Sequence, residues 1–224
     1  MAQQKIGIIA GASGLVGKSV LHYALESSSY ERIICLVRTK MDIQHPKLEQ
    51  VITDFSNIGS YAFWTEADTV FCCIGTTMKK AGSKEAFRKV DFEIPKALIN
   101  AAQHTQTQFH LLSSIGADPK SNVFYLKTKG EIEDYLIHSG IFSGHIYRPS
   151  LLIGKRDEFR FGEKMAILFN SLFSFLFFGP LKKYRGIKAE QVAEIMVKNS
   201  EQESEMGIQI HENVDMFASK GKQL

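Results

Sequence analysis

The sequence predicts an α/β fold in which helices cover both faces of a parallel sheet. Apolar, strand-like segments alternate with amphipathic helical segments along most of the 224 residues. The strand segments are almost continuously apolar, which is typical of strands that are buried on both faces. The first of them runs directly into a glycine-rich turn and a helix, so we expect it to be central in the sheet.

The predicted elements follow one another from the N-terminus. Strands are expected at residues 5–10, 32–37, 50–53, 68–73, 109–113 and 143–147, with a late strand at 208–211. Helices are expected at residues 15–26, 84–102, 125–139, 163–178 and 189–199, where apolar residues recur at helical spacing. Pro95 is expected to kink the second helix or to begin a new turn within it, and Gly140 is a C-cap signal.

The domain organisation is predicted to be simple. We expect residues 1–224 to form one doubly wound Rossmann domain, with residues 150–224 contributing a small substrate-facing lobe. The alternating rhythm changes after Pro149, and the remaining segment is too short for a core of its own.

Composition and charge exclude several classes of protein. The chain has 27 Lys and Arg against 24 Asp and Glu, a net charge of +3, and no basic run interleaved with aromatic residues, so we expect no nucleic-acid partner. No apolar segment approaches ~20 residues, so we expect no transmembrane helix. The histidines lack ligand spacing, so we expect no metal site.

The three cysteines and the N-terminus bear on the compartment. Cys35, Cys72 and Cys73 lie in apolar strand-like segments, which favours buried thiols over disulfides. The N-terminus lacks the features of a signal peptide. These observations predict a reducing, cytoplasmic setting.

The turn after the first strand has the spacing G-x-x-G-x-x-G. Such a turn presents backbone N–H groups and the positive end of a helix to a pyrophosphate. It therefore predicts a dinucleotide site, and the residues expected to contact the cofactor are Gly11, Ala12, Ser13, Gly14, Leu15, Val16 and Gly17. The similar Walker A loop, which binds nucleoside triphosphates, requires glycine where this chain has Ala12.

Charge after the second strand indicates which dinucleotide is bound. NAD-binding proteins place an acidic residue about 20 residues after the glycine motif to hold the ribose 2′-hydroxyl. This chain has Arg38-Thr39-Lys40 there, and an arginine fork suits a phosphate better than a hydroxyl. We expect NADP(H) rather than NAD(H), with Arg38 and Lys40 at the 2′-phosphate. The alternative is that Arg38 is a surface arginine without a ligand.

Gly75, Thr76 and Thr77 close the fourth strand and are expected to line the ribose and diphosphate.

A second motif, Y-x-x-x-K, is formed by Tyr125 and Lys129. Positions i and i+4 share one helix face, so a phenol and an ammonium can point into one cleft. An unperturbed phenol titrates near ~10, and a neighbouring cation favours its ionised form. The alternative is a solvated helix face.

Asp91 and Glu93 are spaced i, i+2, so they do not face each other and a solvated edge is expected there.

Four stretches together resemble the short-chain dehydrogenase/reductase superfamily, in its atypical or extended branch. They are GASGLVG at residues 11–17, SSIGAD at 113–118, YLKTK at 125–129 and YRPS at 147–150. The stretch SSIGADPKSNVFYLKTKGEIE at residues 113–133 resembles the Tat-interacting-protein-type oxidoreductases and their bacterial NAD(P)-binding relatives, and the resemblance covers roughly residues 5–200. One departure is the short stretch between the serines and Tyr125.

The resemblance implies roles at the matching positions. Tyr125 would be the general acid that protonates a carbonyl oxygen, and Lys129 would hold the nicotinamide ribose and tune that tyrosine. Ser114, with Ser113 as second choice, would hydrogen-bond the substrate oxygen. The remaining implied contacts are Pro149 and Ser150 beside the nicotinamide, and Asp54 and Phe55 near the adenine.

Two functions of different classes follow. The first is an NADP(H)-dependent oxidoreductase that transfers hydride to or from a small carbonyl or alcohol substrate. The second is an NADP(H)-binding, redox-sensing regulatory protein without turnover. A segment rich in phenylalanine, Phe169–Phe178, could be core, a lid, a membrane-surface contact, or the contact for a homodimer or protein partner. A sugar-nucleotide epimerase is a third possibility, for which the C-terminal part looks too small.

Overall fold

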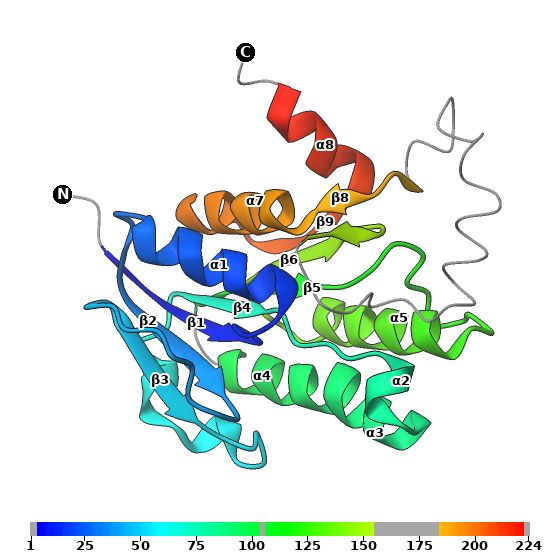
Figure 1. Cartoon of the computed structure of the whole chain (residues 1–224), viewed down its shortest axis with the longest axis horizontal. Helices are drawn as coiled ribbons and strands as arrows, with labels where there is room; N and C mark the ends of the chain where they lie inside the picture. Colours follow the sequence, from blue (N-terminus) through cyan, green and yellow to red (C-terminus); the bar gives the residue numbers. More distant parts are fainter. Residues whose placement is uncertain (1–3, 104–105, 155–183, 222–224) are drawn as a thin grey trace.

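The computed structural model describes residues 4–103, 106–154 and 184–221 (Figure 1). Its main sheet has seven strands in the order β3-β2-β1-β4-β5-β6-β9, and every neighbouring pair is parallel. The predicted fold class is confirmed, and the first strand is central as expected.

The strands lie close to their predicted positions. Their bounds are β1 (Lys5–Ala10), β2 (Tyr30–Val37), β3 (Leu48–Ile52), β4 (Thr69–Cys72), β5 (Gln108–Leu112), β6 (Ser143–Arg148) and β9 (Gly207–Glu212). Two short strands, β7 (Leu152–Ile153) and β8 (Ile187–Lys188), pair with each other outside this sheet.

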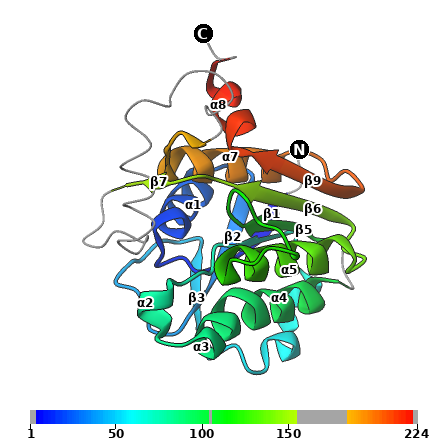
Figure 2. The same ribbon diagram turned by 90° about the vertical axis from the view of Figure 1, so that its right-hand side faces the viewer.

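Helices cover both faces of the sheet (Figures 1 and 2). One face carries α1 (Leu15–Glu26) and α7 (Ala189–Glu201), and the other carries α4 (Ile94–Ala102) and α5 (Phe124–Ile137). The short helices are α2 (Met78–Ala81), α3 (Lys84–Arg88) and α8 (Asn213–Gly221), and 3₁₀ turns occupy Ile58–Ser60 and Ala62–Thr65. None of the helices within the described ranges is long and apolar enough to cross a membrane.

The segment after Pro149 supplies parts of these main layers. Strand β9 extends the sheet beside β6, and α7 packs against α1. The helix expected at residues 163–178, and with it the phenylalanine-rich segment, lies outside the described residues. The separate substrate-facing lobe therefore stays a prediction.

Two apolar cores lie on opposite sides of the sheet, because successive strand residues point to opposite faces. Ile8, Ile34 and Val70 face α4 and α5, whereas Ile9, Ile33 and Phe71 face α1 and α7. All six side chains are fully buried. The three cysteines are buried as well, as the sequence predicts.

The helix expected at residues 84–102 is broken into parts. Helix α3 is followed by a π-helical turn over Lys89–Glu93, and α4 begins directly after it. Pro95 has no N–H, and its ring clashes with the carbonyl four residues earlier in a regular α-helix. The wider π turn accommodates the proline, so the expected irregularity is present.

A network of histidines crosses the face of the sheet beneath α7. His110 of β5, His145 of β6 and His211 of β9 are brought together by the strand register, with Tyr147 beside them. The rings of His110 and His145 stack at 4.6 Å, as do those of Tyr147 and His211. The network is hydrogen-bonded, with His145 Nδ1 3.0 Å from His211 Nε2, and Asn199 of α7 donating to the Tyr147 hydroxyl.

Candidate functional site

The candidate site lies where β1 and β4 are neighbours and end together. The chain continues from β1 toward β2 on one side and returns to β4 on the other, so this is the point at which the strand order reverses. In open α/β sheets, ligands bind at the carboxyl ends of the strands at such a point. The glycine turn follows β1 there, and Gly75 follows β4.

Two glycines of the turn are required by close backbone approaches. Gly11 has φ +89°, and a Cβ on it would lie 2.7 Å from the carbonyl carbon of Cys73. A Cβ on Gly17 would lie 2.1 Å from the carbonyl oxygen of Gly11. A side chain at Gly11 would clash with the backbone that follows β4, and one at Gly17 would push α1 away from the turn.

The start of α1 leaves backbone donors available to an anion. Gly14 is the N-cap and supplies no side chain, and the first turn contains no acidic residue. The first intrahelical hydrogen bond runs from Lys18 N to Gly14 O, so the N–H groups of Leu15, Val16 and Gly17 precede it. The side chains of Ala12 and Val16 are buried, which leaves their backbone as the part that can contact a cofactor. Such a helix start is suited to binding a phosphate.

The turn after β4 forms the other side of the site. Thr76 N donates to Asp91 Oδ2 over 2.8 Å, and a Cβ on Gly75 would lie 3.3 Å from Asp91 Oδ1 and 3.7 Å from Lys129 Nζ. Thr77 caps α2 by accepting a hydrogen bond from Lys80 N. The Gly75–Thr76 backbone therefore lies directly over a buried pair of charges.

That pair consists of Lys129 Nζ and Asp91 Oδ1, 2.8 Å apart. The side chains are 6% and 1% exposed. Burial by itself lowers the pKa of the Lys129 ammonium, but Asp91 and the nearby Tyr125 outweigh it, and the pKa lies above its ordinary value. Lys129 is thus a buried, protonated lysine at the carboxyl edge of the sheet.

Asp91 is the residue that sequence reasoning missed, and the expectation of a solvated edge is wrong for it. The carboxylate belongs to the π-helical turn, and it points into the protein with the residue fully buried. A signal was present. Asp91 follows Phe87 by four positions and precedes Leu98 by seven, so it occupies the apolar face of the helix.

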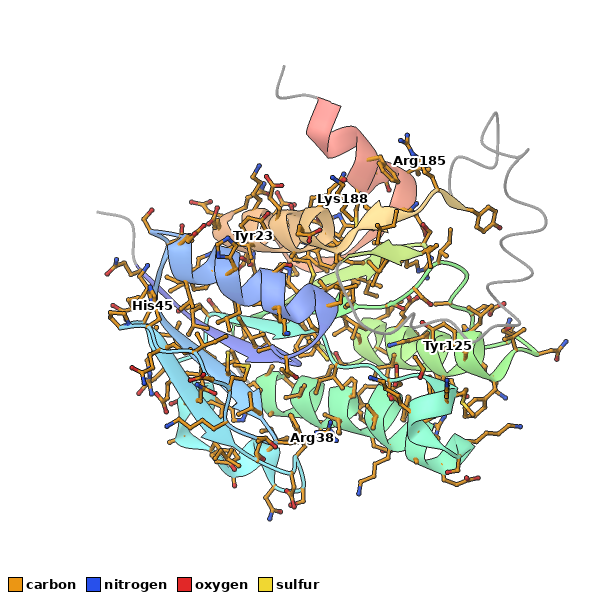
Figure 3. All side chains as sticks on the ribbon, in the orientation of Figure 1. Tyr23, Arg38, His45, Tyr125, Arg185 and Lys188 are labelled. Carbon is orange, nitrogen blue, oxygen red and sulfur yellow. The ribbon has the colours of Figure 1, made fainter. Side chains whose placement is uncertain are left out.

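The proposed acid, Tyr125, lies on α5 one turn before Lys129 (Figure 3). Its side chain is half-buried, and its ring packs edge-on against Phe87 of α3 at 5.8 Å. Because residues four apart share a helix face, the phenol and the ammonium are on the same side of α5.

Ser113 and Ser114 follow β5 with their hydroxyls buried. Neither Oγ has a hydrogen-bond partner among the residues that the structure describes. Their backbone is held by β6 and its continuation, through Ser113 N to Tyr147 O and Ile115 N to Pro149 O. Buried hydroxyls without partners are uncommon in proteins and are free to bond a ligand.

The short connection from the serines to Tyr125 folds back onto α5. Asp118 N donates to Leu126 O over 3.1 Å, and Gly116 turns the chain with φ +77°. A Cβ on Gly130 would lie 2.2 Å from the carbonyl carbon of Asp118. The absence of a side chain at Gly130 lets a short loop reach from β5 to α5.

Pro149 and Ser150, which are predicted to lie beside the nicotinamide, form hydrogen bonds within the protein. Ser150 N donates to Asn213 Oδ1 over 3.0 Å, and its hydroxyl donates to the carbonyl of Arg185. The carbonyl of Pro149 accepts the bond from Ile115 N. Both residues are buried, and their polar groups hold the end of β6.

The residues predicted to contact the adenine end of the cofactor differ in their exposure to solvent. Arg38, which follows β2, is exposed, as is Lys40 (Figure 3). Asp54 is exposed, and its hydrogen bonds from Ser56 hold the pKa of the carboxyl below its ordinary value. Phe55 has φ +67° and a side chain that is 8% exposed and belongs to the core beside α4.

The fold is shared with solved proteins that include dehydrogenases and an epimerase. WbmH of Bordetella bronchiseptica, solved in complex with NAD+, matches with a TM-score of 0.65 at 16% identity, over 93% of this chain and 75% of that one. A short chain dehydrogenase family protein of Francisella tularensis matches with a TM-score of 0.65 at 14% identity, over 96% of this chain and 100% of that one. At these identities the likeness shows the fold.

Sequence comparison identifies the family. Residues 11–159 match the model of the NAD(P)H-binding family, so the chain belongs to that family. It is 34% identical over 169 residues to the protein HTATIP2 of Rattus norvegicus, covering 73% of this chain and 69% of the rat protein. It is 30% identical over 212 residues to the mitochondrial protein FMP52 of Lodderomyces elongisporus, covering 87% and 86%. The resemblance is confirmed at the level of the NAD(P)H-binding family and of HTATIP2, and the fold is that of a solved short chain dehydrogenase family protein.

The prediction of a cytoplasmic location is wrong. The FMP52 relatives, including one from Candida albicans that is 36% identical over 156 residues, are named mitochondrial. The inference rested in part on thiols that were expected to form no disulfides. Buried thiols in a strand report the environment of the core, and they do not identify a compartment.

Proposed function

We propose that this protein is an NADP(H)-dependent oxidoreductase that transfers hydride to or from a small carbonyl or alcohol substrate. The observation that carries the proposal is the buried Lys129, paired with Asp91 over 2.8 Å, one turn after Tyr125 and beneath the Gly75–Thr76 turn. A helical Tyr-Lys pair on a solvated surface would need no buried counter-ion. Here the lysine is held at the carboxyl edge of the sheet, where open α/β sheets bind their ligands, and this supports a cofactor site there.

The residues present fit such a cofactor. The glycine turn leaves backbone donors for a diphosphate, and Arg38 is an exposed cation after β2 that can take a 2′-phosphate. Lys129 keeps two N–H donors beyond the one directed at Asp91, which suits ribose hydroxyls. When bound, the nicotinamide supplies or accepts the hydride.

The side chains would manage the proton and the substrate oxygen. The unpartnered hydroxyl of Ser114 would donate to the substrate carbonyl oxygen, with Ser113 as second choice. Tyr125 would deliver its proton to that oxygen as the carbonyl becomes an alcohol, and it would take the proton back in the reverse direction. The ammonium of Lys129 would stabilise the phenolate that Tyr125 becomes in that step.

Substitution of the tyrosine tests the chemistry. Tyr125→Phe should lower the rate of NADPH consumption with a panel of carbonyl substrates by about a hundredfold or more. NADPH affinity, measured by calorimetry, should be nearly unchanged. Tyr135→Phe, on the same helix with its hydroxyl bonded to Asn100, is the matched control and should retain activity. Turnover by Tyr125→Phe at the rate of the unmodified protein would rule out the assignment.

The choice of cofactor is tested by titrating NADPH and NADH side by side. We expect tighter binding of NADPH, and Arg38→Ala should weaken NADPH by about tenfold or more while leaving NADH unchanged. Equal affinity of the unmodified protein for both would remove Arg38 from the role. Tight NADPH binding with no turnover on any carbonyl, and partner affinity that depends on redox state, would favour the redox-sensing alternative.

A further inference from the structure

The carboxylate of Asp91 joins two parts of the proposed site through its two oxygens. Oδ1 lies 2.8 Å from Lys129 Nζ of α5, and Oδ2 accepts a hydrogen bond of 2.8 Å from Thr76 N after β4. The side chain that makes both contacts is 1% exposed. One buried side chain therefore sets the position of the lysine relative to the turn.

A purely stabilising role explains this arrangement poorly. A buried ion pair contributes little net stability, because desolvation of the two charges offsets their attraction, and apolar residues of similar size often serve as well. The pair also lies directly beneath Gly75, where a Cβ would contact both charged groups. Its location is the ligand-binding edge of the sheet rather than the centre of the core.

We infer that Asp91 is a positioning residue of the cofactor site, holding the ammonium of Lys129 in register with the Gly75–Thr76 turn so that it meets the nicotinamide ribose. The inference rests on the proposed function, since it requires a dinucleotide in the crevice. Asp91 touches neither substrate nor cofactor in this role. It acts through Lys129 and through the backbone of the turn.

Loss of Asp91 should affect the two ends of the cofactor differently. Lys129 serves the nicotinamide ribose, whereas the glycine turn and Arg38 serve the diphosphate and the 2′-phosphate. Loss of Asp91 should therefore weaken binding of the whole dinucleotide and spare a fragment that lacks the nicotinamide half. Adenosine 2′,5′-bisphosphate is such a fragment. A general loosening of the fold would weaken both ligands together.

The experiment is a calorimetric titration of the full chain and its Asp91→Asn variant with NADPH and with adenosine 2′,5′-bisphosphate. Asparagine keeps the size and one acceptor but removes the charge that holds the ammonium. We expect NADPH affinity to fall about tenfold to a hundredfold, with fragment affinity unchanged. The matched control is Glu133→Gln, which weakens another ion pair of α5, between the buried carboxylate of Glu133 and the partly exposed Arg148, and should change neither affinity.

Each other outcome is decisive. Unchanged NADPH affinity in Asp91→Asn, or an equal loss for both ligands, would overturn the positioning role and leave the proposed function standing. Failure of the unmodified protein to bind NADPH would overturn the proposed function and this inference with it. If Asp91→Asn does not fold, the neutral pair Asp91→Asn with Lys129→Gln takes its place. It should bind the fragment and lose NADPH affinity, and retained NADPH affinity would refute the inference.

Discussion

Acidification should destabilise this protein well above the pH at which carboxylates titrate, through the histidine network beneath α7. Burial, and then the neighbouring His211, lowers the pKa of His145 from 6.5 to about 4. Burial and the other two imidazoles hold the pKa of His110 well below its ordinary value. Burial also lowers the pKa of His211, partly opposed by Asp215. All three rings are therefore neutral in the folded protein near neutrality.

The sign follows from proton uptake by the unfolded chain. Between pH 6.5 and about 4, the exposed imidazole of unfolded His145 is protonated and the buried one is not, so unfolding takes up a proton. Stability is fully present above the unfolded pKa and falls as the pH drops through that window. His145 alone should account for a loss of about 2 kcal/mol between about pH 7.5 and about pH 5, with a limit near ~3 kcal/mol below the folded pKa. His110 and His211 act in the same direction.

Urea unfolding at the two pH values measures this loss directly. His145→Phe keeps a ring to stack between His110 and His211 but removes the titrating nitrogen. Loss of the hydrogen bond to His211 should lower its stability at neutral pH by about 1 kcal/mol, and its pH dependence should be shallower than that of the unmodified protein. His22→Gln is the control, because the His22 side chain is 61% exposed on α1.

The reasoning would be refuted in either of two ways. The unmodified protein could show equal stability at both pH values, which would mean that the imidazoles are solvated or already paired with charge. Alternatively, His145→Phe could retain the full pH dependence, which would place the proton uptake elsewhere. Most exposed carboxylates titrate below about pH 5, so they contribute little within this window.

Three further predictions concern close approaches and a buried ion pair. Gly17→Ala places a Cβ 2.1 Å from a backbone carbonyl, so calorimetry should detect no NADPH binding, whereas Gly59→Ala, with open space around it, should bind normally. Gly130→Ala should displace the loop between the serines and α5, and kinetics should show a greater loss in kcat than in NADPH affinity. Arg148→Met leaves the 3%-exposed carboxylate of Glu133 without its partner and should lower the unfolding free energy by about 3 kcal/mol in urea titrations.

The glycine turn was predictable because its requirements are local. An apolar strand, glycines at a fixed spacing and an amphipathic helix specify a turn that the structure places at the β1–β4 junction. Strand β1 and helix α1 accordingly have the predicted bounds. The first strand also lies inside the sheet as expected, between β2 and β4, where the strand order reverses.

Asp91 and the histidine network were not predictable in the same way, because each depends on distant parts of the chain. The side chain of Asp91 is directed inward from a π-helical turn close to Pro95. Its partner, Lys129, lies on α5, far along the sequence. His145 meets His211 only because β9 pairs with β6 in one particular register. A shift of one residue would turn every side chain of that strand to the other face.

Helix α5 shows how these long-range contacts determine the site. Tyr125, Lys129 and Glu133 follow one another at intervals of four along one face, and Lys129 and Glu133 are held by different layers of the protein. Lys129 pairs with Asp91 of the preceding helical segment, and Glu133 pairs with Arg148 of β6. The two ion pairs connect α5 to different parts of the protein, Lys129 to the segment beside the Gly75–Thr76 turn and Glu133 to the sheet. The position of α5 therefore depends on contacts with distant parts of the chain as well as on the short loop that precedes it.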